Sequence, residues 1–275
     1  MTIHRPILLI GGGGKTGSRV ARRLEALGRP FRIGSRSATR VFDWKDRDSW
    51  AAAVDGAQAA YITYYPDVTV PGGVDDIDAF VRLAVDRGCR RLVFLSGRGE
   101  EDAERAEQAL IGSGAEWTVV RAAWFMQNFS ESFFLDGVLA GEVAFPADGV
   151  TEPFVDAEDI ADVVTMALTQ QGHAGKIYDV TGPRLMTFAE AVGEIGKAAG
   201  RDIRYVPVTV EDYVAALKEA DVPEHYIQLL VYLAREVLDG RNESVADGVS
   251  RALGRKPRDF CDYARDAAAS GVWGA

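Results

Sequence analysis

The chain has 275 residues, of which 47% are hydrophobic and 26% charged, so it is long enough to bury a substantial core and its composition excludes a disordered protein. Its formal net charge of -10 argues against a dedicated nucleic-acid or anionic-membrane surface, because both need clustered Lys and Arg. No apolar run suits a signal peptide or a membrane span, so we expect a cytoplasmic protein with a small-molecule partner, as a monomer or homodimer.

Short apolar runs alternate with amphipathic helical stretches through the first half of the chain. We predict strands over 7–10, 30–33, 40–42, 59–64, 91–95 and 117–121, and helices over 15–27, 49–54, 74–87 and 101–112. Such a series builds a parallel sheet with right-handed crossovers and helices on both faces. The sequence therefore predicts an α/β fold with a doubly wound parallel sheet.

The rhythm changes after residue 121, where a loop rich in large side chains begins. Beyond it we predict strands over 153–155 and 176–180, and helices over 156–169 and 187–199, the latter with Thr187 as N-cap and Glu190 three residues on. From Thr209 onward the pattern indicates only helices. We expect a nucleotide-binding domain over 1–150, its sheet completed by parts of 151–206, and a helical substrate lobe over 207–275.

A run of glycines follows the first predicted strand and opens the first helix. Gly11, Gly14 and Gly17 form a G-x-x-G-x-x-G pattern, the context that a dinucleotide-binding site requires. The first glycine allows a sharp turn, the middle one lets the backbone approach a pyrophosphate, and the last lets helix and sheet pack closely. The predicted pyrophosphate site comprises Gly11, Gly13, Gly14, Lys15, Thr16 and Gly17. A P-loop is the poorer interpretation, because Leu9 stands where that motif needs a glycine.

The end of the second predicted strand indicates which nicotinamide cofactor is bound. NAD-dependent enzymes usually place Asp or Glu there, but no acid occurs between Arg29 and Phe42. Instead Arg36 lies between Ser35 and Ser37, and a guanidinium suits the 2′-phosphate of NADP(H). A solvated surface arginine is the alternative.

The remaining predicted cofactor contacts follow the third and fourth predicted strands. Asp43 and Trp44 are expected near the adenine, where a carboxylate accepts from the amino group. Tyr64, Tyr65 and Ser96, the last at the end of the strand predicted over 91–95, complete this set. The histidines and cysteines have no metal-ligand spacing, so we expect no metal.

These motifs, in this order, resemble the NmrA-like atypical short-chain dehydrogenases. The stretches at 42–44, 95–96, 117–121, 124–129 and 153–160 look like that family, and the pattern is similar to the branch with the ergot-alkaloid festuclavine and agroclavine reductases. The resemblance implies a Rossmann sheet with a small C-terminal substrate lobe, NADP(H) on the glycine loop and a substrate cleft between the two parts. It does not fix the activity, because the family mixes reductases with sensors of the cofactor's redox state.

The sequence departs from the catalytic pattern of ordinary short-chain dehydrogenases, which use Ser, Tyr and Lys. Ser96 stands where the family serine belongs and is our catalytic candidate, but Gly99 and Ala103 occupy the Tyr and Lys positions. His225 or Tyr226 of the C-terminal lobe is an alternative proton donor. Two interpretations follow. A cationic acceptor such as an iminium needs only hydride, so positioning over the nicotinamide suffices. Alternatively nothing is reduced, and cofactor binding shifts the C-terminal lobe.

We favour the reductase, because aromatic residues after the fifth predicted strand suit the wall of an apolar pocket. The predicted substrate-binding residues are Trp124, Phe125, Asn128 and Phe154, with Asn128 as the polar member that orients the substrate. Core packing is the alternative for each aromatic, and contact with loop backbone is the alternative for Asn128.

Overall fold

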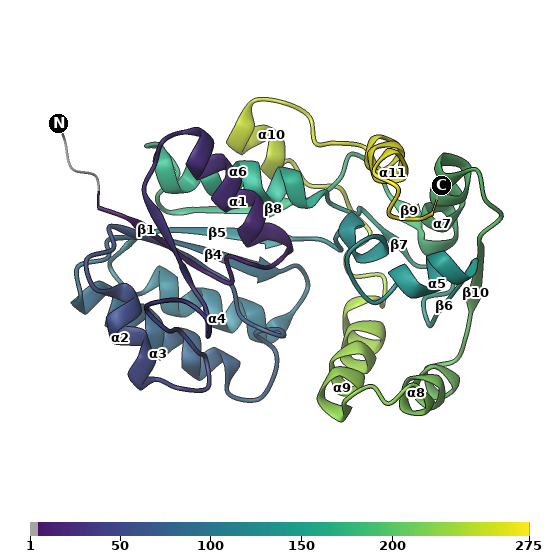
Figure 1. Ribbon diagram of the computed structural model, residues 1–275, viewed down its shortest axis with the longest axis horizontal. Coiled ribbons are helices and arrows are strands. Elements are labelled where there is room, and N and C mark those ends of the chain that lie inside the picture. Colours follow the sequence, from purple (N-terminus) through teal and green to yellow (C-terminus); the bar gives the residue numbers. More distant parts are fainter. Residues whose placement is uncertain (1–4, 275) are drawn as a thin grey trace. The chain divides into compact units, whose positions relative to one another are not determined.

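The computed structural model describes residues 5–274, which form two compact units (Figure 1). The first unit comprises residues up to Ala122 together with Ala157–Val180 and Asp247–Arg255. The second comprises Ala123–Asp156, Thr181–Ala246 and the residues from Lys256 onward. Residues 123–150, which the sequence analysis assigned to the nucleotide-binding domain, thus lie in the second unit, and a C-terminal segment returns to the first.

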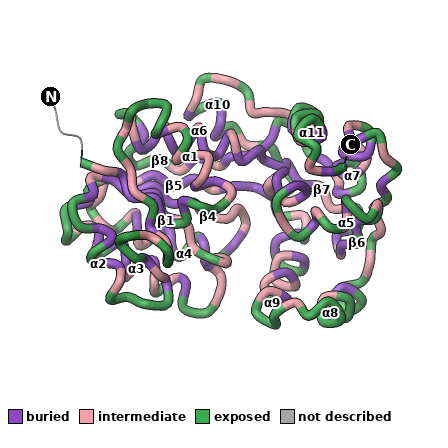
Figure 2. The backbone as a smooth tube through the Cα atoms, in the orientation of Figure 1, coloured by how far each residue is buried: buried purple, intermediate pink, exposed green. Residues whose placement is uncertain are grey.

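Six parallel strands form the sheet of the first unit, in the order β2-β1-β3-β4-β5-β8. They are β1 (Ile7–Ile10), β2 (Phe31–Gly34), β3 (Ala59–Ile62), β4 (Arg91–Gly97), β5 (Glu116–Ala122) and β8 (Lys176–Val180). Every residue of β1 and β3 is buried, which explains their continuous apolar sequences (Figure 2). The six corresponding predicted strands are confirmed to within two residues at each end.

Helices cover both faces of this sheet (Figure 1). On one face lie α1 (Lys15–Ala26), α6 (Ala157–Thr169) and α10 (Gly248–Leu253); on the other lie α2 (Asp48–Val54), α3 (Gly73–Asp86) and α4 (Glu101–Ile111). Arginines of α1 hold α6 through ion pairs, with Arg19 Nε 2.7 Å from Glu158 Oε1 and Arg23 Nε 2.6 Å from Asp162 Oδ1.

The strand expected at 40–42 is wrong. The chain makes a single parallel bridge there, between Ser35 and Val41, and then turns inward at Phe42. Arg40 is held by the carbonyl oxygens of Ala52 and Asp55, at 3.1 and 2.9 Å. Packing of the Phe42 ring in the core, and not strand pairing, therefore fixes this segment.

The second unit contains short strands and helices around an aromatic core. Its elements are η1 (Met126–Phe129, a 3-10 helix), α5 (Leu135–Ala140), β6 (Glu142–Phe145), β7 (Thr151–Glu152), β9 (Met186–Thr187), α7 (Phe188–Ala199), β10 (Arg204–Pro207), α8 (Val210–Glu219), α9 (Glu224–Tyr232), η2 (Leu233–Val237, a π-helix) and α11 (Phe260–Ala269). The strands pair as β6 with β10, in parallel, and β7 with β9, antiparallel. Strands β6, β9 and β10 were not predicted from the sequence.

Two local predictions in this unit had different outcomes. The strand expected at 153–155 is wrong: β7 ends at Glu152, because Pro153 has no N–H to offer a ladder, and Val155 makes only an isolated bridge with Phe125. The capping box of α7 is confirmed, since Thr187 Oγ1 accepts from Glu190 N at 3.1 Å and Glu190 Oε2 accepts from Thr187 N at 2.8 Å.

The protein therefore has the predicted α/β, Rossmann-type fold with a mainly helical C-terminal region. Within the first unit the chain runs from β1 to β2 on one side and continues through β3 on the other, so the sheet order reverses between β1 and β3. In open α/β sheets, ligands bind outside the carboxyl ends of the strands at such a switch point. Among the described residues no helix is both long and apolar enough to cross a membrane.

Candidate functional site

The glycine loop lies directly at this switch point, between the end of β1 and the start of α1. Gly11 has φ +71, a conformation that favours glycine, and its carbonyl oxygen accepts from Gly14 N at 2.8 Å to close the turn. A Cβ on Gly17 would lie 2.3 Å from the Gly11 carbonyl oxygen, so this glycine lets the helix start against the loop. Gly11 and Gly17 thus shape the loop itself.

The middle of the loop faces outward. Gly13 and Gly14 are exposed, and a Cβ on Gly13 would meet no atom within 4 Å. The first turn of α1 follows at once, and the N–H groups of a first turn have no acceptor within their own helix. Backbone donors, the positive helix end and open space together fit a pyrophosphate.

Not every predicted residue of this loop offers its side chain. Thr16 is buried, and its Oγ1 accepts from the Tyr61 hydroxyl at 2.8 Å, which ties α1 to β3. Its side chain is therefore engaged in the fold, and only its backbone remains suited to a phosphate. Lys15 is partly exposed at the start of α1.

The segment after β2 carries an exposed arginine between two hydroxyl residues. Arg36 is exposed and makes no hydrogen bond or ion pair with any residue between 5 and 274 that the structure records. Ser35 and Ser37 flank it with hydroxyls 3.3 Å apart. Arg32, by contrast, donates to the Asp55 carbonyl oxygen at 2.7 Å. Arg36 is thus available for a ligand at this edge of the sheet.

The residues expected near the adenine are mostly engaged in packing. Trp44 is buried, donates from Nε1 to the Thr63 carbonyl oxygen at 3.1 Å and lies 4.7 Å from Tyr64, centroid to centroid. Asp43 Oδ1 accepts from Lys45 N at 3.0 Å. The Tyr64 hydroxyl donates to Asp76 Oδ2 at 2.7 Å, and burial and that carboxylate raise the pKa of Tyr64. Tyr65 alone is largely exposed, at 68%.

Ser96 lies at the end of β4 but its hydroxyl faces the protein. It is buried and donates to Glu107 Oε1 at 2.6 Å. Glu107 is completely buried in α4 and is ion-paired with Arg121 of β5, with Nε 2.9 Å from Oε1 and Nη2 2.5 Å from Oε2. The hydroxyl proton of Ser96 is already donated to Glu107, so its oxygen can only accept a hydrogen bond from a ligand.

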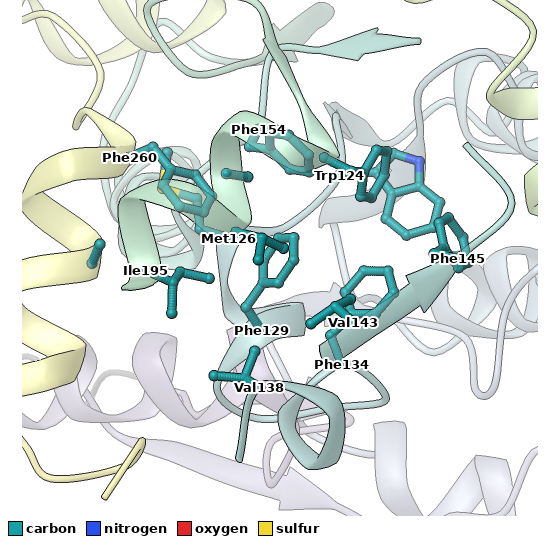
Figure 3. Close-up of a cluster of buried hydrophobic side chains, with 14 of the residues drawn as sticks. Trp124, Met126, Phe129, Phe134, Val138, Val143, Phe145, Phe154, Ile195 and Phe260 are labelled. Carbon is teal, nitrogen blue, oxygen red and sulfur yellow. The ribbon is translucent and has the colours of Figure 1, made fainter. Parts of the chain in front are cut away.

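The aromatic segment after β5 is largely core (Figure 3). Trp124 and Phe154 are 8% and 2% exposed, and both rings pack on Phe188, with centroids 5.5 and 5.1 Å away. Two of the predicted substrate residues therefore contribute to packing within the second unit. Phe125 and Asn128 are partly exposed and keep accessible surface for a ligand.

Sequence reasoning missed one polar pair at the same edge of the sheet. Asp67 follows β3 and Glu100 follows β4, and although 33 residues separate them, burial and then the charge of Asp67 raise the pKa of Glu100. Neither belongs to a motif, so only the spacing of the two strand ends could have suggested the pair. The described residues contain no group of three or more His, Cys, Asp or Glu that could hold a metal.

No family model matches the sequence. The chain is 30% identical to an agroclavine dehydrogenase of Claviceps fusiformis over 94% of its own length and 96% of that protein's, and 29% identical to an NAD(P)H azoreductase of Xenophilus azovorans over 96% and 98%. These similarities run nearly end to end. They therefore concern both units of the chain.

Solved structures show the same fold. The triphenylmethane reductase of Citrobacter sp., solved with NADP(H), superimposes with a TM-score of 0.76 at 18% identity, covering 95% of this chain and 99% of that one. NmrA, described as a negative transcriptional regulator, superimposes with a TM-score of 0.70 at 16% identity, covering 99% and 100%. With the open glycine loop and the near full-length relatives, these findings show that the chain belongs to the NmrA-like atypical short-chain dehydrogenase family of NAD(P)-binding oxidoreductases.

Proposed function

We propose that this protein is an NADP(H)-dependent reductase that transfers hydride to a small organic acceptor. The observation that carries the proposal is the glycine loop, whose exposed Gly13 and Gly14 offer open backbone beside the switch point of the sheet. Bound there, the cofactor supplies a hydride from its nicotinamide. Backbone N–H groups of the loop and of the first turn of α1 would hold its pyrophosphate, and the carboxyl edge of the sheet, where β3 and β4 also end, would take the nicotinamide.

The preference for NADP(H) over NAD(H) rests on Arg36. It is exposed, it lies between two hydroxyl residues, and no acid occupies the position that would bind the ribose hydroxyls of NAD. A guanidinium binds a phosphate with two parallel hydrogen bonds and keeps its charge at every physiological pH. We therefore infer that the 2′-phosphate is bound by Arg36, Ser35 and Ser37.

The acceptor class follows from what stands at the Tyr and Lys positions. Gly99, in the turn after β4 with φ +76, and the buried Ala103 have no ionisable side chain, so neither supplies a proton. Acceptors that need no tyrosine acid are therefore favoured, such as an iminium, or one whose proton comes from another group. Among relatives, the azoreductase and the agroclavine dehydrogenase are named for different substrates, so the branch does not specify one compound.

The missing tyrosine and lysine also favour a second function, a redox sensor that binds the cofactor without turnover. Purified protein mixed with NADPH and a panel of iminium, quinone, enone and azo acceptors, followed by the absorbance of reduced nicotinamide, separates the two. Acceptor-dependent loss of that absorbance supports the reductase. Tight binding of both redox forms at different affinities, without turnover of any acceptor, would replace it with the sensor.

A further inference from the structure

Two acidic residues follow adjacent strands at the carboxyl edge of the sheet, the edge where the cofactor is proposed to bind. Asp67 lies in the loop between β3 and α3, and Glu100 is the N-cap residue of α4. β3 and β4 are adjacent and parallel, so both loops leave the sheet at the same edge. Glu100 is only 7% exposed, and its carboxyl group fills the space beside Gly97, where a Cβ would lie 2.0 Å from Glu100 Oε1.

The hydrogen bonds of the pair are unequal. Asp67 Oδ1 accepts from Thr69 N at 2.9 Å and from Thr69 Oγ1 at 2.8 Å, so this carboxylate is well supplied with donors. Glu100 Oε2 is buried and receives no hydrogen bond from the residues that the structure describes. An ionised carboxylate in that position would be costly, because a buried charge needs donors or a cation.

Burial and the charge of the neighbouring carboxylate both raise the pKa of Glu100. Asp67 is the ionisable group that faces Glu100 from the neighbouring loop, while Arg98 and Glu101 are its nearest charged neighbours in the chain. Burial, and then the charge of Asp67 and the hydrogen bond to it, raise the pKa of Glu100 well above its ordinary value. Burial also raises the pKa of Asp67, against the bonds from Thr69. Burial and the facing carboxyl therefore both favour the neutral form of Glu100.

Another buried glutamate of the same region shows that this arrangement is not required by the fold. Glu107, in α4, is fully buried but is ion-paired with Arg121 and accepts from Ser96. A guanidinium compensates the charge of Glu107, whereas a second carboxyl faces Glu100. Glu100 Oε2 therefore lacks, among the described residues, the compensation that Arg121 gives Glu107.

We propose that Glu100 is the proton donor of the reductase and that Asp67 is the positioning residue that keeps the proton on it. This rests on the proposed reductase function. Reduction of a quinone, enone or azo group adds one hydride, which carries two electrons, and one proton. The proton leaves the Glu100 carboxyl for the oxygen, carbon or nitrogen of the acceptor, both carboxyls are then ionised, and one solvent proton restores the pair. Glu100 thereby donates the proton that the side chains of Gly99 and Ala103 cannot supply.

The first test needs no turnover. At neutral pH an infrared spectrum should contain the carbonyl band of a protonated buried carboxylic acid, which disappears in Glu100→Gln and persists in Glu101→Gln, a matched change at an exposed position. The pH dependence of stability tests the protonation of Glu100 independently of the spectrum. Above the ordinary pKa of glutamate the unfolded chain loses this proton while the folded protein keeps it, so wild-type stability falls as pH rises.

Removing the group removes that dependence. The melting temperature of Glu100→Gln relative to wild type should therefore rise between about pH 5 and about pH 8. A relative melting temperature that does not change with pH, or a spectrum without the band, would overturn the shared proton.

The second test uses the acceptors. Glu100→Gln should lower kcat for quinone, enone or azo acceptors by about 10²- to 10⁴-fold, the usual contribution of a general acid, and should leave KM and NADPH affinity unchanged. Iminium reduction, which needs no proton, should be unaffected. Asp67→Asn should shift the alkaline limb of the pH–activity profile to lower pH, because the charge that raises the pKa of Glu100 is gone.

The outcomes separate this inference from the proposed function. If wild type reduces proton-requiring acceptors and Glu100→Gln does so at an equal rate, the donor role fails and the reductase stands. If wild type reduces only iminium acceptors, the donor role fails as well. If wild type reduces no acceptor, the proposed function and the donor role both fall, and the infrared band still reports whether the pair shares a proton.

Discussion

The glycine loop of the first unit and the aromatic cluster of the second are both dense in one kind of residue, yet the structure uses them differently. The loop leaves open backbone, since a Cβ on Gly13 would meet no atom within 4 Å and both Gly13 and Gly14 are exposed. The aromatic cluster is closed, with Phe129 and Phe154 almost completely buried (Figure 3). The repeated glycines leave backbone accessible to a ligand, whereas the repeated aromatic side chains pack against one another.

The largest expected effect is on the stability of the aromatic cluster. Phe129 is completely buried, with ring centroids 4.8 Å from Phe134 and 5.8 Å from Phe260. Phe129→Ala should lower the free energy of unfolding by about 3 to 5 kcal/mol, measured by denaturant titration, because it leaves a cavity among rings that cannot all collapse. Affinity for adenosine 2′,5′-bisphosphate, which reports only the phosphate end of the site, should not change. A loss below about 1 kcal/mol would mean that this ring lies in a pocket and not in the core.

In the glycine loop we expect substitution of Gly13 to reduce cofactor affinity and to leave stability unchanged. Gly13→Val and Gly14→Val should reduce NADPH affinity by more than about a hundredfold, because the added side chains occupy the space of the pyrophosphate. Gly13→Val should also keep the wild-type melting temperature, since its Cβ meets no protein atom within 4 Å. Gly17→Val is the control for damage to the loop itself, because its Cβ would lie 2.3 Å from the Gly11 carbonyl oxygen. Unchanged NADPH affinity in Gly13→Val and Gly14→Val would remove the loop from the binding site.

Arg36→Ala should weaken NADPH by about tenfold to a hundredfold and NADH hardly at all, because a charge-assisted contact to phosphate is worth about 1.5 to 3 kcal/mol. Calorimetry with both cofactors measures this. Added salt should weaken NADPH more than NADH, since part of the contact is screened. A wild-type preference for NADH, or equal weakening of both cofactors by the substitution, contradicts the role of Arg36 and leaves the glycine loop untouched.

The smallest effect is expected at Ser96. Its proton already goes to Glu107, so toward a bound nicotinamide carboxamide it offers one neutral acceptor. Ser96→Ala should therefore lower turnover by about threefold to tenfold, the scale of one neutral hydrogen bond. Glu107 keeps its ion pair with Arg121 in this variant, so the fold should survive. Turnover within about twofold of wild type would make Ser96 a structural residue.

These comparisons also explain what could be predicted from the sequence. Apolar runs such as Ile7–Ile10 and the Thr187 capping box depend on neighbours in the chain, and the structure confirms them. The loop glycines could be recognised for the same reason. The pairing of β6 with β10 and the placement of Asp67 and Glu100 at one edge of the sheet depend on residues far apart in sequence, for which no local pattern exists.

The aromatic residues show a different limit. Core and pocket select the same apolar side chains, so the pattern at 124–134 does not distinguish Trp124, which packs on four other rings, from the partly exposed Phe125. A pyrophosphate site differs in kind, because it needs residues without side chains at fixed spacing. Backbone sites can therefore be recognised from sequence more readily than pockets made of side chains.

The central claim is hydride transfer from bound NADPH, and isotope transfer tests it most directly. Each C4 deuterated epimer of NADPH would be incubated with the protein and with whichever acceptor of the iminium, enone, quinone and azo panel consumes it, and the oxidised cofactor and any carbon-reduced product analysed by mass spectrometry. We expect one epimer to lose its deuterium to the acceptor. When an iminium or enone is reduced, that deuterium should appear on a carbon of the product. Gly13→Val should abolish the transfer. Retention of deuterium in the cofactor with both epimers and every acceptor would contradict the account and leave a protein that binds the cofactor without using it.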